Sequence, residues 1–595
     1  MIKKINLNGQ WDFVADLDPK YHNDISIHGV IANSRPDINR RHWKKVQVPG
    51  VWQKYGERYD IYEGVCWFVR EFSIDDYIEV TPSFLRFGAV NYLCRVFLNG
   101  VEVGGHETGY TEFTLDVTNT LKRGKNHLAV MVDNRALVTK WPPCLGYFNY
   151  GGIHRDVMLE IMEGPCLKDV WVHGDYVDGE CLLKISGRVQ GQTTEKGNES
   201  MRIEAACCEQ SIKIPVDAEG SFKLEMNMEK AAPWTPDSPQ LYNTFMKLME
   251  GNQEMDHDTF EIGFKRIEMK NGRVMLNGAD LRFKGVCYVY DSPETGLVMM
   301  EEQVYKDVRL MKEMGCNAVR CHYPMDRRFY EACDRVGILV WIEPTVYCYH
   351  PKDDAQNTAF SNPDWTGLAE QMIQEMIGVA RKHVSVSIYG IGNECNTANP
   401  EAEEFFKSLA AVARQNDPYR LISYAALYGI VGPIADIVDV VGVNSYWGWY
   451  DKIDGGKGLK PEDGSWQKDA ESGMEPIDLT PMRNMLEEIM KNGPKNLALL
   501  LTEFGADSVP GYFSRSRDLW SEDYHAALLD EIFTLAENYP QIIGTFPFCF
   551  TDYRDPSKPV NGYWNEQNLK GLVTYERRKK MSYGAAQRYY KNIEK

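Results

Sequence analysis

The sequence lacks several features that mark whole classes of protein. No run of about 18 apolar residues occurs in its 595 residues, so no transmembrane helix is expected. The 14 cysteines include no C-x-x-C pair and no spacing suited to a zinc site, which favours free thiols in a reducing cytoplasm. No apolar signal segment follows Met1, and this adds to the expectation of a cytoplasmic protein.

Positive charge is also scarce. The chain has 66 Lys and Arg against 85 Asp and Glu, which gives a net charge of −19. Such a chain is repelled by phosphate backbones and by anionic membrane surfaces, so neither nucleic acid nor a membrane is an expected partner. If the substrate is an anion, cationic side chains must be placed locally beside the chemistry.

The pattern of the sequence changes twice along the chain, which is too long for one hydrophobic core. Residues 1–163 contain short alternating segments and turns such as Asn99-Gly100, which predict an all-β sandwich. Residues 164–265 continue this spacing over the length of one immunoglobulin-like β-sandwich. From residue 266, apolar runs alternate with amphipathic helical stretches, which predicts parallel strands with crossover helices.

Residues 266–595 contain eight candidate strands, which predict a (β/α)₈ barrel. The strands are Leu281–Cys287, Asn317–Cys321, Ile338–Glu343, Val386–Glu394, Leu421–Ala425, Ile437–Asn444, Ala498–Glu503 and Ile542–Phe550. A Gly-rich, polar stretch from Asp451 to Asp478 follows the sixth strand and predicts a mobile loop over the active face.

Glu394 ends the fourth candidate strand and Glu503 ends the seventh. Residues at the carboxyl ends of barrel strands face one shared mouth. Two carboxyl groups there can cleave a glycosidic bond, and a separation of roughly 5 to 5.5 Å would give retention of configuration. The alternative for any single strand-end glutamate, such as Glu343, is a polar residue that binds loop amides.

Motifs spread over nearly the whole chain carry a family resemblance. They are Leu7-Asn8-Gly9-Gln10-Trp11, Tyr62-Glu63-Gly64, Phe148 to Val157, Gly263-Phe264-Lys265-Arg266, His322-Tyr323-Pro324, Ile391-Gly392-Asn393-Glu394 and Leu501-Thr502-Glu503-Phe504-Gly505. Together they resemble glycoside hydrolase family 2. The resemblance implies that the first sandwich is a jelly-roll-like sugar-binding domain. It also implies that Glu394 is the general acid/base, that Asn393 contacts the sugar 2-hydroxyl, and that Glu503 is the nucleophile.

Within that family, the segments Val443 to Tyr450 and Trp520 to Tyr524 look like the bacterial β-glucuronidase version. The likeness implies that Tyr446 orients the nucleophile and that Tyr450 reaches the sugar carboxylate, although packing beneath a loop is the alternative. Asn568-Leu569-Lys570 matches the Asn-x-Lys motif with which β-glucuronidases read the C6 carboxylate. An ammonium and an amide can orient that group, whereas a solvated lysine is the alternative.

Four positions depart from the family pattern. Gly146 stands where many relatives carry an aspartate, and only Asp291 remains of a His-Glu-Asp triplet. Phe548 replaces a tryptophan, and the second-strand motif that ends in His322 is one residue short. Asp291, His322 and Phe548 are still expected among the substrate-binding residues, but recognition of the 3- and 4-hydroxyls is put in doubt.

The expected function is a retaining, exo-acting hydrolase that removes β-linked glucuronic acid from glucuronide conjugates through a glycosyl-enzyme intermediate. A β-galacturonidase, a β-galactosidase or a β-mannosidase are the alternatives, followed by a non-catalytic carbohydrate-binding protein. No metal or cofactor is required, and no motif decides whether a flavin nucleotide binds at a surface site, as in some bacterial relatives. A homo-oligomer, tetramer or dimer, is expected. The polar segment between Pro344 and Trp365 predicts an open mouth that accepts varied aglycones.

Overall fold

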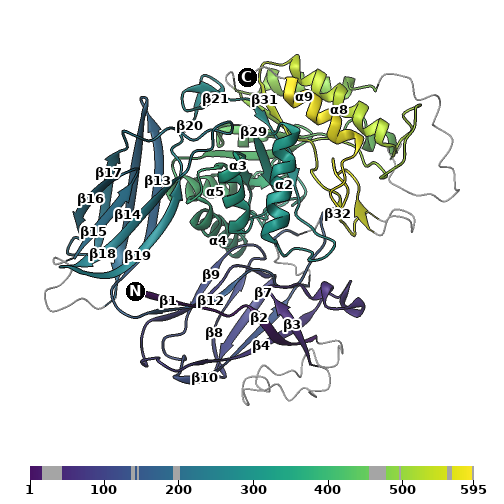
Figure 1. Cartoon of the computed structure of the whole chain (residues 1–595). Helices are drawn as coiled ribbons and strands as arrows, with labels where there is room; N and C mark the ends of the chain where they lie inside the picture. The colour runs from purple at the N-terminus through teal and green to yellow at the C-terminus, as the bar shows by residue number, and fades with distance from the viewer. Residues whose placement is uncertain are drawn as a thin grey trace.

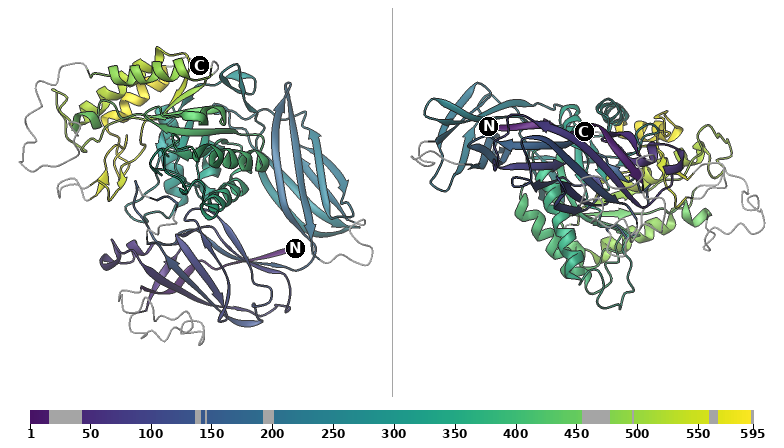
Figure 2. Two further views of the ribbon diagram at one scale, coloured as in Figure 1. Left: turned by 180° about the vertical axis from the view of Figure 1, so that it is seen from behind. Right: turned by 90° about the horizontal axis from the view of Figure 1, so that it is seen from below.

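Three domains form the molecule (Figure 1). The structure is a computed structural model that describes residues 1–15, 43–135, 141–143, 146–191, 201–453, 477–494, 497–558 and 566–592. Two β-sandwiches flank the third domain from two sides, as the view from behind also shows (Figure 2). The predicted fold class is confirmed.

The N-terminal domain packs a four-stranded antiparallel sheet against a six-stranded one. The first has the order β1 (Ile2–Asn6), β12 (Val157–Met162), β5 (Ser83–Phe87), β9 (Phe113–Asp116). The second has the order β3 (Lys44–Val48), β2 (Gly9–Ala15), β4 (Val65–Ile74), β10 (Gly124–Asp133), β7 (Leu93–Leu98), β8 (Val101–Glu107). Alternate residues of β10, such as Leu128 and Val130, point into the core. The predicted turn between β7 and β8 is confirmed, with positive φ at Asn99 and Gly100.

The second domain is a smaller sandwich of two antiparallel sheets. One contains β13 (Cys166–Val177), β14 (Glu180–Gln190) and β17 (Ser221–Asn227), and the other contains β16 (Gln210–Pro215), β15 (Met201–Cys207), β18 (Tyr242–Glu250) and β19 (Gln253–Ile262). A short antiparallel sheet of β20 (Ile267–Lys270), β21 (Arg273–Leu276) and β22 (Ala279–Asp280) leads into the barrel.

The third domain is a closed parallel barrel. Its strands are β23 (Phe283–Lys284), β24 (Cys287–Tyr288), β25 (Ala318–Cys321), β26 (Leu339–Ile342), β27 (Val386–Asn393), β28 (Leu421–Leu427), β29 (Val440–Asn444), β30 (Leu499–Glu503) and β31 (Ile542–Thr545). The first predicted strand is divided: β23 pairs with β31 and β24 pairs with β25, so this strand closes the ring. β31 ends at Thr545, short of the predicted Phe550, because the amides of Phe548 and Cys549 bond to Phe504 and Lys570.

Helices cover the outside of the barrel. They are α2 (Glu301–Met314), α3 (Arg327–Val336), α4 (Pro363–Ala380), α5 (Ala402–Asn416), α7 (Thr480–Asn492), α8 (Glu522–Glu537) and α9 (Met581–Asn592), with the short α6 (Tyr450–Ile453). Between β28 and β29 the connection is a 3₁₀ turn, η6 (Gly432–Asp436). Most of the predicted mobile loop, residues 454–476, lies outside the described residues.

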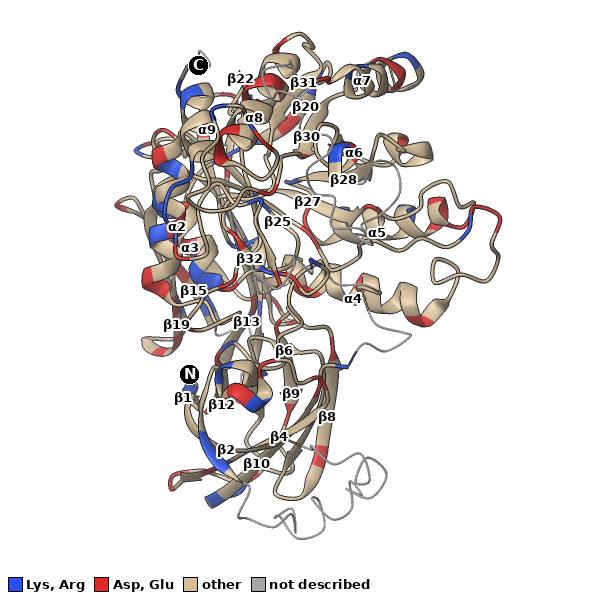
Figure 3. Ribbon diagram, turned by 90° about the vertical axis from the view of Figure 1, so that its right-hand side faces the viewer, with Lys and Arg blue, Asp and Glu red and all other residues tan. Residues whose placement is uncertain are grey.

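Acidic and basic residues are interspersed along the sandwiches and the barrel (Figure 3). In the described part of the chain, no helix has the length and apolar character that crossing a membrane requires.

Candidate active site

The carboxyl ends of the barrel strands border a cavity of about 310 Å³. Nine of the ten predicted site residues line it: His322, Asn393, Glu394, Tyr446, Tyr450, Glu503, Phe548, Asn568 and Lys570. The N-terminal sandwich contributes Gly146 and Tyr147 to the wall. The size is in the range of small-molecule sites, and it suits one sugar ring with part of an aglycone.

Strand geometry brings the two glutamates to this cavity. Every residue of β27 and of β30 is buried, so both strands are held on all sides. Glu394 directly follows β27, and Glu503 is the last residue of β30. Because β30 is paired in parallel with β29, Glu503 lies beside Asn444, whose amide reaches back to Glu394.

Glu503 is surrounded by donors. The Tyr446 hydroxyl donates to Oε2 (2.7 Å), and Arg320 Nη1 donates to Oε1 (2.9 Å). His322 Nε2 lies 2.8 Å from Oε1. Burial acts to raise the pKa of Glu503, but His322, Arg320 and Tyr446 outweigh it and lower this pKa to about 2. The carboxylate is therefore ionised at neutral pH.

The pKa of Glu394 is shifted in the opposite direction. Burial and the negative charge of Glu503 raise its pKa to about 7. Asn444 Nδ2 donates to Oε1 (2.6 Å) and the Cys348 thiol lies 3.7 Å from Oε2, which act in the other direction. One carboxyl group that keeps its proton near pH 7 thus shares a cavity with one that does not. This is the division that acid/base and nucleophilic roles require.

Arg320 of β25 is fully buried and hydrogen-bonds to several of the side chains at the cavity floor. Its guanidinium donates to both oxygens of Glu343 (2.8 and 3.0 Å), to Glu503, and to Asn393 Oδ1 (2.8 Å). Glu343 is therefore the ion-pair partner of Arg320 rather than a cavity residue. Neither role could be assigned from the sequence; the available signal was an arginine near the end of the second strand, beside the strand that ends in Glu343.

The far side of the cavity is cationic. Lys570 lies after β33 (Gln567–Asn568), and its ammonium binds Asp507 Oδ2 (2.5 Å) and lies 4.8 Å from the centre of the Tyr450 ring. Lys558 Nζ donates to the Tyr450 hydroxyl (2.6 Å). Asn568 Nδ2 donates to the hydroxyl of Tyr553 (3.1 Å), on β32 (Tyr553–Arg554).

Charges of both signs meet on this side of the cavity. Asp507 neutralises Lys570; burial acts to raise the Asp507 pKa, but Lys570 and Lys558 hold it below its usual range. Lys558 has no carboxylate partner among the ion pairs of the described residues. Asp555 also lines the cavity, and Lys558 acts on its carboxyl group without a direct ion pair. The Lys558 ammonium is therefore available to an anionic substrate group at this end of the cavity. Sequence reasoning missed both Lys558 and Asp507.

Asp291 is the predicted site residue that the structure places elsewhere. It accepts hydrogen bonds from the hydroxyls of Tyr150 (2.8 Å) and Tyr575 (3.0 Å) and from the amide of Arg554 (2.9 Å). It does not line the cavity, and its oxygens join the first sandwich to the barrel. We therefore leave it out of the proposed substrate contacts.

Phe548 and His322 form one wall of the cavity. Their rings meet edge to face, with centroids 5.6 Å apart, and Phe548 also meets Tyr446 edge to face at 6.4 Å. The described residues contain no group of three His, Cys, Asp or Glu side chains placed to hold a metal ion.

Comparison with known families accounts for all three domains. The profile described as "Glycosyl hydrolases family 2, TIM barrel domain" matches residues 267–595. The profile of the sugar binding domain of the same family matches residues 4–162, and a third family 2 profile matches residues 167–265.

The individual proteins that match have low sequence identity to this chain. A putative β-glucuronidase of Formosa agariphila is 26% identical over 96% of this chain and 68% of its own length. A β-glucuronidase of Paenibacillus borealis is 25% identical over 97% of this chain and 94% of its own. The crystal structure of a β-galacturonidase from Eisenbergiella tayi bound to galacturonate is 24% identical, with a TM-score of 0.82 over 100% of this chain and 98% of that chain.

Proposed function

Since the chain belongs to glycosyl hydrolase family 2, and is thereby a glycoside hydrolase, we propose that it is a retaining β-glucuronidase with Glu394 as general acid/base and Glu503 as nucleophile. The observation that carries the proposal is the opposite protonation of two carboxyl groups in one cavity. Enzymes of this kind need no cofactor for catalysis.

In the first step, Glu394 gives its proton to the glycosidic oxygen while Glu503 attacks the anomeric carbon. The carbon–oxygen bond to the aglycone breaks, and an ester bond forms between Glu503 and the sugar. Tyr446 and Arg320 hold the attacking carboxylate in place through Oε2 and Oε1. Asn393, fixed by Arg320 through Oδ1, keeps its amide nitrogen for the sugar 2-hydroxyl.

In the second step, the ionised Glu394 takes a proton from water, and the resulting hydroxide attacks the same carbon. The ester bond to Glu503 breaks and the free sugar leaves with the configuration of the substrate. Loss of the bond to carbon restores the negative charge on Glu503, which again raises the pKa of Glu394 and prepares it for the next substrate.

The preference for a uronic acid rests on the cationic side of the cavity. Asn568 and Lys570 are the proposed readers of the C6 carboxylate, together with Tyr450. Because Lys570 is paired with Asp507 and Lys558 forms no ion pair among those of the described residues, Lys558 is the ammonium that a substrate carboxylate can bind and a neutral sugar does not need.

Trapping tests the mechanism separately from the sugar. A 2-fluoro glucuronyl fluoride should label Glu503, as peptide mapping by mass spectrometry would show, and Glu503→Gln should remain unlabelled. A protein that only binds carbohydrate would take up no label. A panel of 4-nitrophenyl glycosides then identifies the sugar, and highest activity on the β-glucoside would contradict the proposed uronic acid preference.

A β-galacturonidase is the second candidate. Gly146 presents no side chain to the cavity, and Asp291 is engaged elsewhere, so two expected contacts to the 3- and 4-hydroxyls are missing. These hydroxyls include the one at carbon 4 that distinguishes galacturonic from glucuronic acid. The same panel decides the matter, because the candidates predict opposite orders of kcat/KM for the two uronides.

Two further proposals concern the cellular location and the oligomeric state of the protein. A cytoplasmic location is supported by free thiols at described cysteines such as Cys94, Cys166 and Cys181. We further propose a homo-oligomer, dimer or tetramer, on the family resemblance, and light scattering after size-exclusion chromatography measures it.

A further inference from the structure

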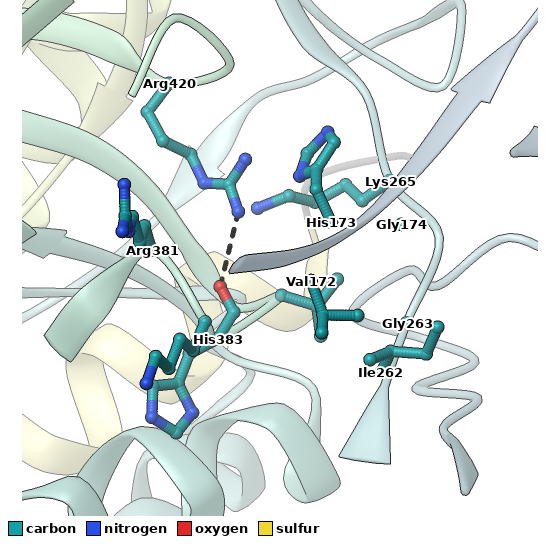
Figure 4. A pocket seen from close by; sticks show the side chains of 11 residues that line it. Val172, His173, Gly174, Ile262, Gly263, Lys265, Arg381, His383 and Arg420 are labelled. Atoms are coloured by element: carbon teal, nitrogen blue, oxygen red, sulfur yellow. Dashed lines mark hydrogen bonds between the residues drawn. The ribbon is translucent and has the colours of Figure 1, made fainter. Parts of the chain in front are cut away.

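A second, much smaller cavity lies where the immunoglobulin-like domain meets the barrel (Figure 4). Its wall is formed by His173 and Gly174 of β13, by Lys265 of the linker, and by barrel residues 381–384 and Arg420. The barrel residues precede β27 and β28, so the cavity is at the opposite end of the strands from Glu394. With eight residues in β27, the separation is roughly 25 Å.

Basic side chains gather at this cavity, and the nearest carboxylates, Asp334 and Asp417, act on Lys265 only through space. Lys265, Arg381, Lys382 and Arg420 line it, and none of them has a carboxylate partner among the ion pairs found in the described ranges. Figure 4 shows the ends of Lys265 and Arg420 directed toward each other. Burial and the charge of Arg420 lower the pKa of Lys265 well below its usual range.

The carboxylates nearby are already engaged. Asp334 binds His383 Nδ1 (2.7 Å) and the amide of Ser385 (2.8 Å). Asp175 is paired with Lys184 (2.9 Å) and with Arg266 (2.8 Å).

Asp417 accepts a hydrogen bond from the hydroxyl of Tyr389 (2.9 Å) and another from the amide of Tyr419 (3.0 Å). The three carboxylates close to the junction thus hydrogen-bond to other groups, and none of them forms an ion pair with the lysine and arginine side chains that line the cavity.

Three buried side chains at this cavity have nitrogen atoms with hydrogen-bonding capacity left for a bound ligand. Lys265 is 2% exposed and uses two of its three N–H groups, on the carbonyl of Val386 (2.8 Å) and on Ser387 Oγ (2.6 Å). Arg420 is 7% exposed and its Nε has no partner; His173 is 4% exposed and its Nε2 has none. Buried donors in proteins are normally matched, so unmatched ones at one cavity indicate a missing acceptor.

The size and lining of the cavity limit which ligand can bind there. Its volume of about 10 Å³ leaves room for one monatomic or water-sized ligand and excludes a polyatomic anion. Arg420 Nε can only donate, and four lysine and arginine side chains line the cavity, so an anion would satisfy this donor and lower the local excess of positive charge together, which a neutral water molecule would not do. We propose that this cavity binds a small monovalent anion of the size of chloride, which ties the immunoglobulin-like domain to the barrel.

Anion-dependent melting tests the site, since a ligand that binds the folded state raises the melting temperature to a saturating value. Sodium acetate is replaced stepwise by sodium chloride or bromide at constant ionic strength. Acetate is too large for the cavity and serves as the reference. The wild type should gain about 1–3 °C, saturating with halide concentration. Because the site is remote from Glu394, kcat should not change with the halide.

Two variants make the effect specific. Arg420→Met removes the unmatched Nε and should abolish the halide-dependent shift. Lys184→Met removes a lysine at the same junction that is paired with Asp175 and does not line the cavity, and it should retain the shift. A shift that is equal in all three proteins would be a general salt effect and would overturn the proposal.

Crystals of the wild type grown in bromide give an answer that does not depend on folding of the variants. The expected result is an anomalous peak at bromine wavelength between Lys265 Nζ, Arg420 Nε and His173 Nε2. Density without anomalous signal there would mean an ordered water only, and the anion site would be refuted.

Discussion

Replacing Lys558 by methionine tests how this enzyme is proposed to choose an acidic sugar. The ammonium touches the Tyr450 hydroxyl and has no carboxylate partner among the described ion pairs, so the substitution removes one net charge from the cavity. A hydrogen bond to a charged group contributes about 1.5–3 kcal/mol. Lys558 is partly exposed, and solvent screening therefore places the loss at the lower end.

We expect kcat/KM for 4-nitrophenyl β-D-glucuronide to fall about 10- to 30-fold, and the value for the matching glucoside to stay within about twofold. Lys579→Met is the control, because this exposed lysine of the same terminal segment binds Glu313 and not the cavity. It should change neither substrate. If Lys558→Met lowered both substrates equally, Lys558 would support folding of the cavity wall and would not read charge.

Lys570→Met should be more severe, because it leaves Asp507 buried, ionised and unpaired beside the substrate carboxylate. Breaking a buried pair in this way costs about 3–5 kcal/mol, so glucuronide cleavage should fall more than about 100-fold. Adding Asp507→Asn should recover part of this loss. No recovery in the double variant would contradict the charge balance described for this end of the cavity.

Four further outcomes can be checked. Glu394 must carry a proton to act as an acid, so kcat/KM should fall as the pH rises through about 7, and Cys348→Ala should move that limb to higher pH by removing a contact that lowers the Glu394 pKa. Tyr446→Phe should lower kcat about 10- to 100-fold with little change in melting temperature, because a buried donor to the nucleophile is lost. Arg320→Met leaves the buried carboxylates of Glu343 and Glu503 without their cation. It should therefore reduce the free energy of unfolding by about 3–5 kcal/mol, seen as a large fall in melting temperature. Most of residues 350–357 are exposed, so small and bulky glucuronides should be cleaved at rates within about tenfold.

The strand ends of the barrel could be predicted from the sequence because they depend on local pattern. β27 and β30 are unbroken buried runs, and a parallel strand covered on both faces requires that composition. Once both are strands of one barrel, Glu394 and Glu503 must face the same mouth. The three-domain organisation followed for the same reason, because changes of hydrophobic period are visible without any tertiary contact.

Contacts between distant segments could not be predicted in this way. Arg320 meets Glu503 across 183 positions, and Lys570 meets Asp507 across 63, and no local pattern encodes either pairing. In the sequence, Lys558 is one lysine in a polar turn. Its proposed role is visible only in the structure, where the other lysine at the cavity, Lys570, is paired with Asp507.

Asp291 illustrates the reverse case. The family resemblance predicted a contact of Asp291 with the sugar, but the hydroxyls of Tyr150, in the first sandwich, and Tyr575, in the terminal segment, donate to its oxygens. The role of a polar residue at a strand end is thus decided by which partners arrive from elsewhere in the fold.

The two proposed catalytic groups and three of the groups proposed to read the sugar carboxylate belong to different parts of the chain. Glu394 and Glu503 close central barrel strands, whereas Lys558, Asn568 and Lys570 follow the last one. A change in the terminal segment can therefore redirect the enzyme to another sugar while the machinery of bond cleavage is inherited intact. In an engineered or evolving lineage, new specificity would arise first after Thr545, and swapping that segment between relatives is the direct way to obtain it.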